Sequence, residues 1–170
     1  SVNFLEEINI SAYKIASADL TNFPLIQHIA KLKKPMIIST GMSSIEEIEL
    51  TVNFVKNKNV PFVLLHCNST YPSPVELLNL NLISKLREKF NVPIGYSGHE
   101  YGLVTTFAAV AMGATWVERH ITMNRDDFGS DQKASIEPSG VFKLVKGIRE
   151  IEQAIQYEPG PRKQFEGENF

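Results

Sequence analysis

The sequence predicts an α/β fold in which parallel strands alternate with helices. Short apolar runs rich in β-forming residues recur along the chain, and a stretch of helical character separates each run from the next. Because these runs are continuously apolar, we expect a parallel sheet that is buried on both faces. Polar residues follow directly after each run. The carboxyl ends of the strands are therefore the predicted location of the chemistry.

Five pairs of strand and helix are expected in order. The predicted strands cover residues 13–16, 36–39, 62–66, 94–97 and 115–120, and the predicted helices cover residues 24–32, 44–55, 78–90, 103–112 and 141–157. At the start of the second helix, Ser43 and Ser44 each precede a glutamate by three residues, which is typical of a capping box. The last helix carries an apolar stripe formed by Ile148, Ile151 and Ile155.

The number of units leaves two architectures open. A closed eight-stranded barrel takes roughly 250 residues, whereas this chain has 170. The residues therefore predict either an open doubly wound sheet or a barrel without its first three units. The loop after the first strand, SADLTNFP, contains no glycine, unlike the phosphate loop of the usual open-sheet nucleotide fold. Residues 1–158 are expected to form the domain, and residues 159–170, within the tail EPGPRKQFEGENF, an exit segment.

The composition excludes several classes of protein. Hydrophobic residues make up 43% of the chain and charged residues 21%, which is typical of a globular domain with a sizeable core. The net charge of −2, without a basic cluster, argues against a nucleic-acid partner. No apolar run reaches the roughly 18 residues of a membrane helix, and the first residues lack the layout of a signal peptide. Cys67 is the single cysteine, so we expect a reducing, cytoplasmic setting.

Two histidines stand at the ends of neighbouring predicted strands. His99 follows the strand over residues 94–97, and His120 ends the strand over residues 115–120. Because the carboxyl ends of parallel strands meet at one rim, the two imidazoles predict a metal or catalytic site there. The alternative for either residue alone is a buried imidazole with satisfied hydrogen bonds. His28 is expected at the surface, and His66, beside Cys67, is expected to be structural or to support the site.

One lysine lies within the first predicted strand, and several hydroxyl groups end or follow predicted strands. Lys14, placed with serines at positions 17, 39, 69 and 97, would combine one cation with four hydroxyls, a set suited to holding phosphate. Serine is also a common turn former, so the recurrence carries the prediction rather than any one residue. A lysine in an otherwise apolar strand would be costly to bury without an anion. The implied ligand is a phosphorylated small molecule.

Six ordered motifs resemble those of the N-acetylneuraminate (sialic acid) synthase family. They are KIASAD, STGM, LHCNSTYPSP, GYSGHE, ERHIT and GSDQKASIEP, at residues 14–19, 39–42, 65–74, 95–100, 118–122 and 129–138. The resemblance implies a partial (β/α)8 TIM barrel with strands four to eight, without the strands that carry the family's catalytic glutamate base. It also implies condensation of phosphoenolpyruvate with an N-acetylated hexose such as N-acetylmannosamine. Phosphate is released, and the product is a nine-carbon 2-keto sugar acid such as N-acetylneuraminate.

The resemblance implies roles for the strand-end residues. His99 and His120 match the family's two protein ligands to a divalent metal, usually Mn²⁺, with Mg²⁺ or Co²⁺ as alternatives. The positions that match the family's phosphoenolpyruvate-binding residues are Lys14, Ser17, Ser39, Ser69 and Ser97. Lys14 is in addition expected to take part in catalysis.

Further roles concern the sugar and the surroundings of the metal. Asp19 matches an acidic position near the sugar and is a second catalytic candidate. Tyr71 and Asp131 match residues that line the sugar side. For Glu118 two interpretations are open: support of the metal ligands, or a structural ion pair with Arg119.

Three alternatives accompany this interpretation. The first is a different acceptor sugar, which would give a legionaminic-type acid. The second is that the chain taken alone is a catalytically silent fragment that retains phosphate or metal binding. A third possibility is an aldolase or isomerase, for which Lys14 would form a Schiff base. The resemblance further implies a homodimer in the full-length protein, with a C-terminal antifreeze-like domain.

Overall fold

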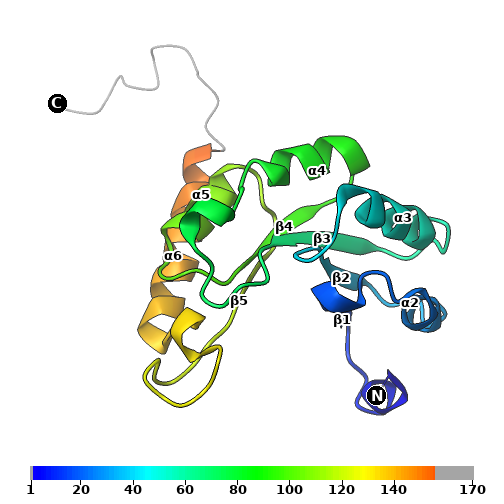
Figure 1. The fold of residues 1–170 in the computed structure, drawn as a ribbon, viewed down its shortest axis with the longest axis horizontal. Helices are drawn as coiled ribbons and strands as arrows, with labels where there is room; N and C mark the ends of the chain where they lie inside the picture. The colour runs from blue at the N-terminus through cyan, green and yellow to red at the C-terminus, as the bar shows by residue number, and fades with distance from the viewer. Residues whose placement is uncertain (1, 156–170) are drawn as a thin grey trace, which may run out of the picture.

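The computed structural model describes residues 2–155, and its strands form one parallel sheet (Figure 1). The strands are β1 (Tyr13–Ile15), β2 (Met36–Ser39), β3 (Phe62–Cys67), β4 (Ile94–Gly98) and β5 (Val117–Arg119). They lie in the sheet in chain order, and every neighbouring pair is parallel. A doubly wound sheet reverses its strand order at a switch point. The unreversed order therefore decides for the half-barrel, and the predicted partial TIM barrel is confirmed.

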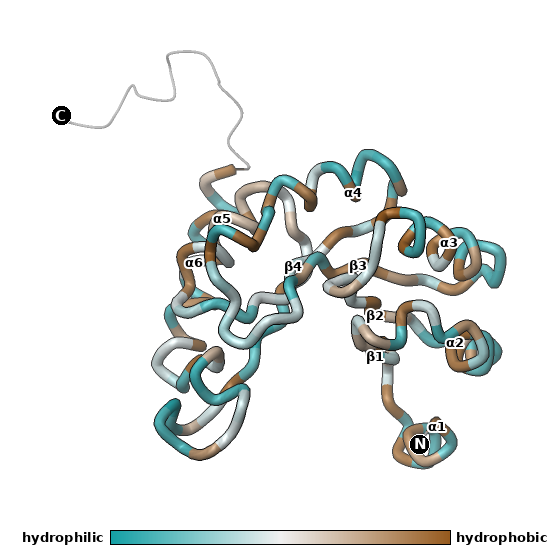
Figure 2. The backbone as a smooth tube through the Cα atoms, in the orientation of Figure 1, coloured by the Kyte–Doolittle hydropathy of each residue, from teal (hydrophilic) through white to brown (hydrophobic). Residues whose placement is uncertain are grey.

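Helices follow the strands and lie along the outside of the sheet. They are α2 (Phe23–Ala30), α3 (Ile45–Lys56), α4 (Leu82–Phe90), α5 (Val104–Ala111) and α6 (Pro138–Ile155). In Figure 1 they form an arc from α2 on the right, past α4 at the top, to α6 on the left. Figure 2 shows apolar and polar positions mixed along α3 and α4, as expected for helices with one face on a sheet.

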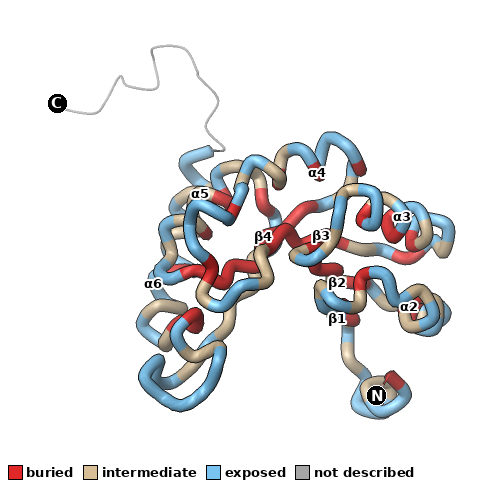
Figure 3. Tube along the Cα trace, viewed as in Figure 1, coloured by how far each residue is buried: buried red, intermediate tan, exposed pale blue. Residues whose placement is uncertain are grey.

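The core lies between the strands and this layer of helices. Ile38 of β2, Leu64 of β3 and Ile94 of β4 are at most 1% exposed. Figure 3 shows the buried residues concentrated along β1 to β4. All three residues of β5 are only partly buried.

Some predicted boundaries were wrong for local reasons. The helix expected over residues 78–90 begins only at Leu82, since Asn79 takes a left-handed φ of 45° that a helix does not accommodate. The last helix begins at Pro138, three residues before the expected start, because proline suits a first helical turn. Of the two capping serines, Ser44 forms the box with Glu47, whereas the backbone N–H of Ser43 donates to Thr40. The exit segment over residues 159–170 lies outside the described residues.

The helix α1 (Val2–Glu7) was not predicted. It has six residues, which is too short for a helical period to be recognised. Side-chain contacts attach it to the sheet: Glu6 accepts hydrogen bonds from the Tyr13 hydroxyl at 2.8 Å and from Lys34 Nζ at 2.7 Å. None of the helices in residues 2–155 has the length and apolar character needed to cross a membrane.

Candidate functional site

A cavity of about 330 Å³ opens at the carboxyl ends of the strands. Each of the five strands or the loop after it contributes to its walls. The lining residues are Lys14, Ala16, Ser17, Ala18, Ser39, Met42, Cys67, Ser69, Tyr71, Ser97, His99, Glu118 and His120. A larger groove of about 470 Å³ lies between residues 121–123 and the start of α6, but its walls are almost wholly apolar. The smaller cavity is therefore the candidate site.

Lys14 and Glu118 form the charged floor of this cavity. Lys14 Nζ donates to Ser39 Oγ at 2.8 Å and lies 3.6 Å from Glu118 Oε1. The same carboxylate oxygen accepts a hydrogen bond from Ser97 Oγ at 2.8 Å. The lysine side chain is 36% exposed, so the cost of burying its charge in the sheet does not arise. Its ammonium group faces the cavity walls with partners already in place and is available to an incoming anion.

Close packing beside this floor depends on the absence of a side chain at Gly41. A Cβ atom there would lie 2.6 Å from Ser69 Oγ and 2.7 Å from Cys67 Sγ. The Gly41 N–H donates to Ser17 Oγ at 3.0 Å, and this hydroxyl lies 3.4 Å from Cys67 Sγ. The glycine of the STGM motif thus brings three strand-end loops together around Ser17 and Ser69.

The two imidazoles lie next to each other and close to Glu118, because Ser97 Oγ, which donates to Glu118, is 3.4 Å from His99 Nε2. The ring centroids of His99 and His120 are 5.3 Å apart, and the Tyr71 ring packs against both, at 4.2 and 5.4 Å. Nδ1 of His99 donates to the Asn68 carbonyl at 2.6 Å, which leaves Nε2 of the neutral ring as a lone-pair donor. Burial lowers the pKa of His99, which favours this neutral form. Nδ1 of His120 lies 3.6 Å from a carboxylate oxygen of Asp131.

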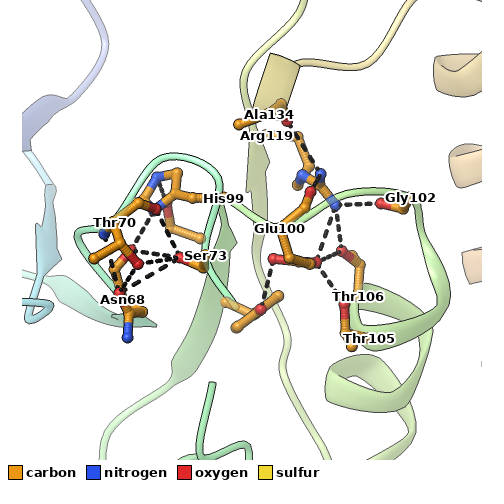
Figure 4. A network of polar contacts seen from close by, with 12 residues as sticks. Asn68, Thr70, Ser73, His99, Glu100, Gly102, Thr105, Thr106, Arg119 and Ala134 are labelled. Carbon is orange, nitrogen blue, oxygen red and sulfur yellow. Dashed lines mark hydrogen bonds and ion pairs between the residues drawn. The ribbon is translucent and has the colours of Figure 1, made fainter. Parts of the chain in front are cut away.

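A loop holds His99 in this orientation, as Figure 4 shows. The Asn68 side chain accepts hydrogen bonds from the backbone and the hydroxyl of Thr70, at 3.0 and 2.6 Å. The backbone N–H of Ser73 donates to the His99 carbonyl at 2.9 Å. Hydrogen bonds of this kind fix the tautomer and the direction of an imidazole that binds a metal.

The donor set fits a metal ion held by two imidazoles together with oxygen donors from outside the chain. Within residues 2–155 no group of three or more His, Cys, Asp or Glu is arranged to hold an ion, so His99 and His120 would be the protein's share. A site with two protein ligands leaves positions open for substrate or water, which is the arrangement of catalytic rather than structural metals.

Of the two interpretations left open for Glu118, the structure excludes the ion pair with Arg119. Glu118 does not pair with Arg119, because neighbouring residues of a strand point to opposite faces. Arg119 pairs instead with Glu100, with Nη1 and Oε1 3.1 Å apart, and the two side chains are 2% and 0% exposed. Glu100 was not among the predicted site residues. Its place directly after a candidate metal ligand was the available signal.

The remaining predicted residues lie at the edge of the site or away from it. Asp19 is not among the residues that line the cavity; its carboxylate accepts from the Asn22 side chain at 3.2 Å beside the start of α2. His66 is buried and its Nε2 contacts the Leu78 carbonyl at 2.7 Å, a structural role. His28 is exposed, as expected.

Comparison with known proteins assigns the chain to a family. The model of the NeuB family matches residues 1–159. The chain belongs to the NeuB family. The resemblance to sialic acid synthases that the six motifs indicated is therefore confirmed.

Two curated NeuB relatives show how far the similarity extends. The N-acetylneuraminate-9-phosphate synthase of Homo sapiens is 43% identical over 156 residues, which are 91% of this chain and 44% of that protein. The N,N'-diacetyllegionaminic acid synthase of Campylobacter jejuni is 40% identical over 158 residues, covering 91% of this chain and 47% of that protein. The chain thus spans less than half the length of these relatives.

Among solved structures, the sialic acid synthetase of Leptospira borgpetersenii, determined in complex with citrate, superposes with a TM-score of 0.91 at 39% identity. The match covers 97% of this chain and 59% of that one. A truncated 3-deoxy-D-arabino-heptulosonate 7-phosphate synthase of Thermotoga maritima, at 20% identity and a TM-score of 0.80, shares the fold.

Proposed function

We propose that this NeuB chain is part of a synthase that condenses phosphoenolpyruvate with an N-acetylated hexose. The observation that carries the proposal is the single cavity in which Lys14 and several hydroxyls face the pair His99 and His120. A cation with hydroxyl donors suits a phosphate or carboxylate, and two imidazoles suit a divalent metal. The names of the relatives, which are synthases of nonulosonic acids, point to the same chemistry.

In the proposed reaction, C3 of phosphoenolpyruvate forms a bond to the aldehyde carbon of the sugar. Water adds to C2, and cleavage of the C2–O bond releases phosphate and leaves the 2-keto acid. Lys14 and Ser39 would hold the phosphate or carboxylate, and Ser97 would orient Glu118 beside them. His99 and His120 would bind the metal, which when bound polarises the aldehyde oxygen. The family resemblance assigns the general base to a glutamate outside the motifs of this chain.

The acceptor sugar is proposed to be N-acetylmannosamine, with a 2,4-diacetamido sugar as the alternative. Relatives named for N-acetylneuraminate 9-phosphate and for legionaminic acid match this chain at 43% and 40% identity, so overall similarity does not separate them. Tyr71 and Asp131, next to the imidazoles, are the proposed sugar contacts. Asp19, outside the cavity lining, is retained as a second proposed catalytic residue.

Three further properties belong to the proposal. Mn²⁺ is the proposed metal, with Mg²⁺ and Co²⁺ as the other candidates that oxygen and imidazole donors accept. A homodimer of the full-length protein follows from the family resemblance, and the free thiol of Cys67 supports a cytoplasmic setting.

Calorimetry with Mn²⁺, in the presence of phosphoenolpyruvate, tests the site. We expect saturable binding that His99→Ala and His120→Ala abolish, whereas the control His28→Ala leaves it intact because that side chain is exposed and remote from the cavity. Binding that does not depend on His99 or His120 would overturn the proposed metal site.

An assay of phosphate release from phosphoenolpyruvate tests the reaction. Release that requires N-acetylmannosamine supports the synthase, and binding without sugar-dependent release supports a silent fragment. Borohydride trapping with a keto substrate tests the aldolase alternative. We expect no adduct, because Lys14 Nζ donates a hydrogen bond to Ser39 and forms an ion pair with Glu118.

A further inference from the structure

A buried charged cluster built on Glu100 and Arg119 lies beside the segment that carries His99 (Figure 4). Glu100 Oε1 accepts hydrogen bonds from Arg119 Nη1 at 3.1 Å and from the hydroxyls of Thr105 and Thr106 at 2.6 and 3.2 Å. Its second oxygen accepts from the Tyr96 hydroxyl at 2.9 Å. Arg119 Nη2 also donates to the backbone carbonyl of Glu100 at 2.7 Å. Side chain and backbone of Glu100 are thus both tied to one guanidinium.

This cluster joins two strands where their backbone pairing stops. The last register pair between β4 and β5 is Gly98 with Arg119, and His99 and His120 are the next residues on the two strands. Past this pair the Arg119 guanidinium bridges to Glu100, directly after His99, and reaches Gly102 at 2.9 Å. The two imidazoles therefore stand on backbone segments that one ion pair connects.

The surroundings of the ion pair indicate that it positions the two strand ends rather than stabilises the fold. A buried ion pair is weak evidence for stability, because desolvation of both charges offsets much of their attraction. The Arg119 Nε–H has no hydrogen-bond partner among the described residues. A side chain at position 98 would also displace the pair: a Cβ on Gly98 would lie 2.9 Å from Glu100 Oε2 and 3.0 Å from Arg119 Cδ. Apolar side chains would fill this space at lower electrostatic cost.

We propose that Glu100 and Arg119 are positioning residues that set the separation of His99 and His120 and so the affinity for a divalent metal. The inference rests on the proposed function in one respect, that these two histidines bind the metal. The loop at Asn68 fixes the direction of the His99 ring, whereas the ion pair fixes where the two strand ends stand relative to each other.

The test measures metal binding in Glu100→Gln and Arg119→Lys by calorimetry with Mn²⁺ and by the absorption spectrum of bound Co²⁺. We expect roughly tenfold weaker Mn²⁺ binding, the lower end of the effect of changing groups that support metal ligands. At saturating Co²⁺ we expect shifted absorption bands, since the two imidazoles meet the ion at a different separation. Gly98→Ala should give the same two changes without removing a charge.

Thr51→Val is the matched control. Thr51 is fully buried in α3 and donates to the Leu20 carbonyl at 2.9 Å, and neither residue lines the cavity. The Thr51→Val substitution should lower the midpoint of thermal unfolding but leave the Mn²⁺ affinity and the Co²⁺ spectrum unchanged. Should Glu100→Gln fail to fold, Arg119→Lys and Gly98→Ala decide the matter.

Two outcomes separate this inference from the proposed function. If all folded variants kept the wild-type Mn²⁺ affinity and Co²⁺ spectrum, the positioning role would be overturned. If His99→Ala still abolished binding in that case, the proposed metal site would stand. Metal binding that is indifferent to His99→Ala and His120→Ala would overturn both.

Discussion

Replacing Lys14 by methionine removes the cation from the cavity and keeps most of the side-chain length. In the free protein Lys14 lies 3.6 Å from Glu118, with side chains 36% and 40% exposed. An ion pair this exposed contributes about 1 kcal/mol or less, so the fold should survive. A hydrogen bond to a charged group is worth about 1.5–3 kcal/mol. The affinity for phosphoenolpyruvate should therefore fall roughly 10- to 150-fold.

Titration calorimetry with phosphoenolpyruvate measures this loss directly, and Lys34→Met is its control. Lys34 also forms an ion pair, with Glu6 at 2.7 Å, but it does not line the cavity. This variant should keep the wild-type affinity although it loses a shorter salt bridge than Lys14→Met does. Equal affinity of Lys14→Met and the wild type would refute the assignment of Lys14 to the bound anion.

Two further predictions concern stability. A Cβ at Gly95 would lie 2.7 Å from the Trp116 carbonyl oxygen, so Gly95→Ala should cost about 1–3 kcal/mol and lower the thermal midpoint by roughly 2–12 °C. Gly140→Ala, whose Cβ would be 3.4 Å from its nearest neighbour, should not lower it, and equal midpoints in both variants would contradict the reasoning. Burial lowers the pKa of His66, so the unfolded chain binds the proton more readily, and the free energy of unfolding should fall as the pH drops below about 6.5. Urea unfolding should show a smaller fall in His66→Gln; an equal fall in both proteins would exclude His66 as a source.

The order of strands and helices followed from the sequence because burial imposes a strong pattern on it. Continuous apolar runs such as residues 62–66 and 94–97 allow few structures other than buried parallel strands. Ends of elements were less predictable, since they depend on single backbone conformations. The left-handed φ at Asn79 delays α4, and a sequence does not announce it, because asparagine is also common inside loops and helix caps.

The cavity lining was predictable to the extent that it depends on strand ends. Lys14, Ser39 and Ser97 stand at or near the ends of predicted strands, and the structure places all three in one cavity. Asp19 was selected by resemblance and lies outside that lining. Glu118 was excludable as the partner of Arg119 from the sequence, because neighbouring residues of a strand point to opposite faces. Glu100 was not predictable as the partner, because it lies after β4 and reaches Arg119 only through the pairing of β4 with β5.

Side chains alternate between the two faces of a strand, so two short motifs supply both the residues that face the cavity and the ion pair behind them. In GYSGHE, Ser97 and His99 face the cavity, whereas Glu100 lies behind it; in ERHIT, Glu118 and His120 face the cavity, whereas Arg119 lies behind it. Gly98 and Arg119 are register partners, so the two histidines are the next residues on the two strands, and Glu100 lies two residues beyond the partner of Arg119. A slip of one residue would exchange both sets at once. Changes of acceptor sugar are therefore expected in the loops beyond the strand ends, where a substitution leaves this register intact.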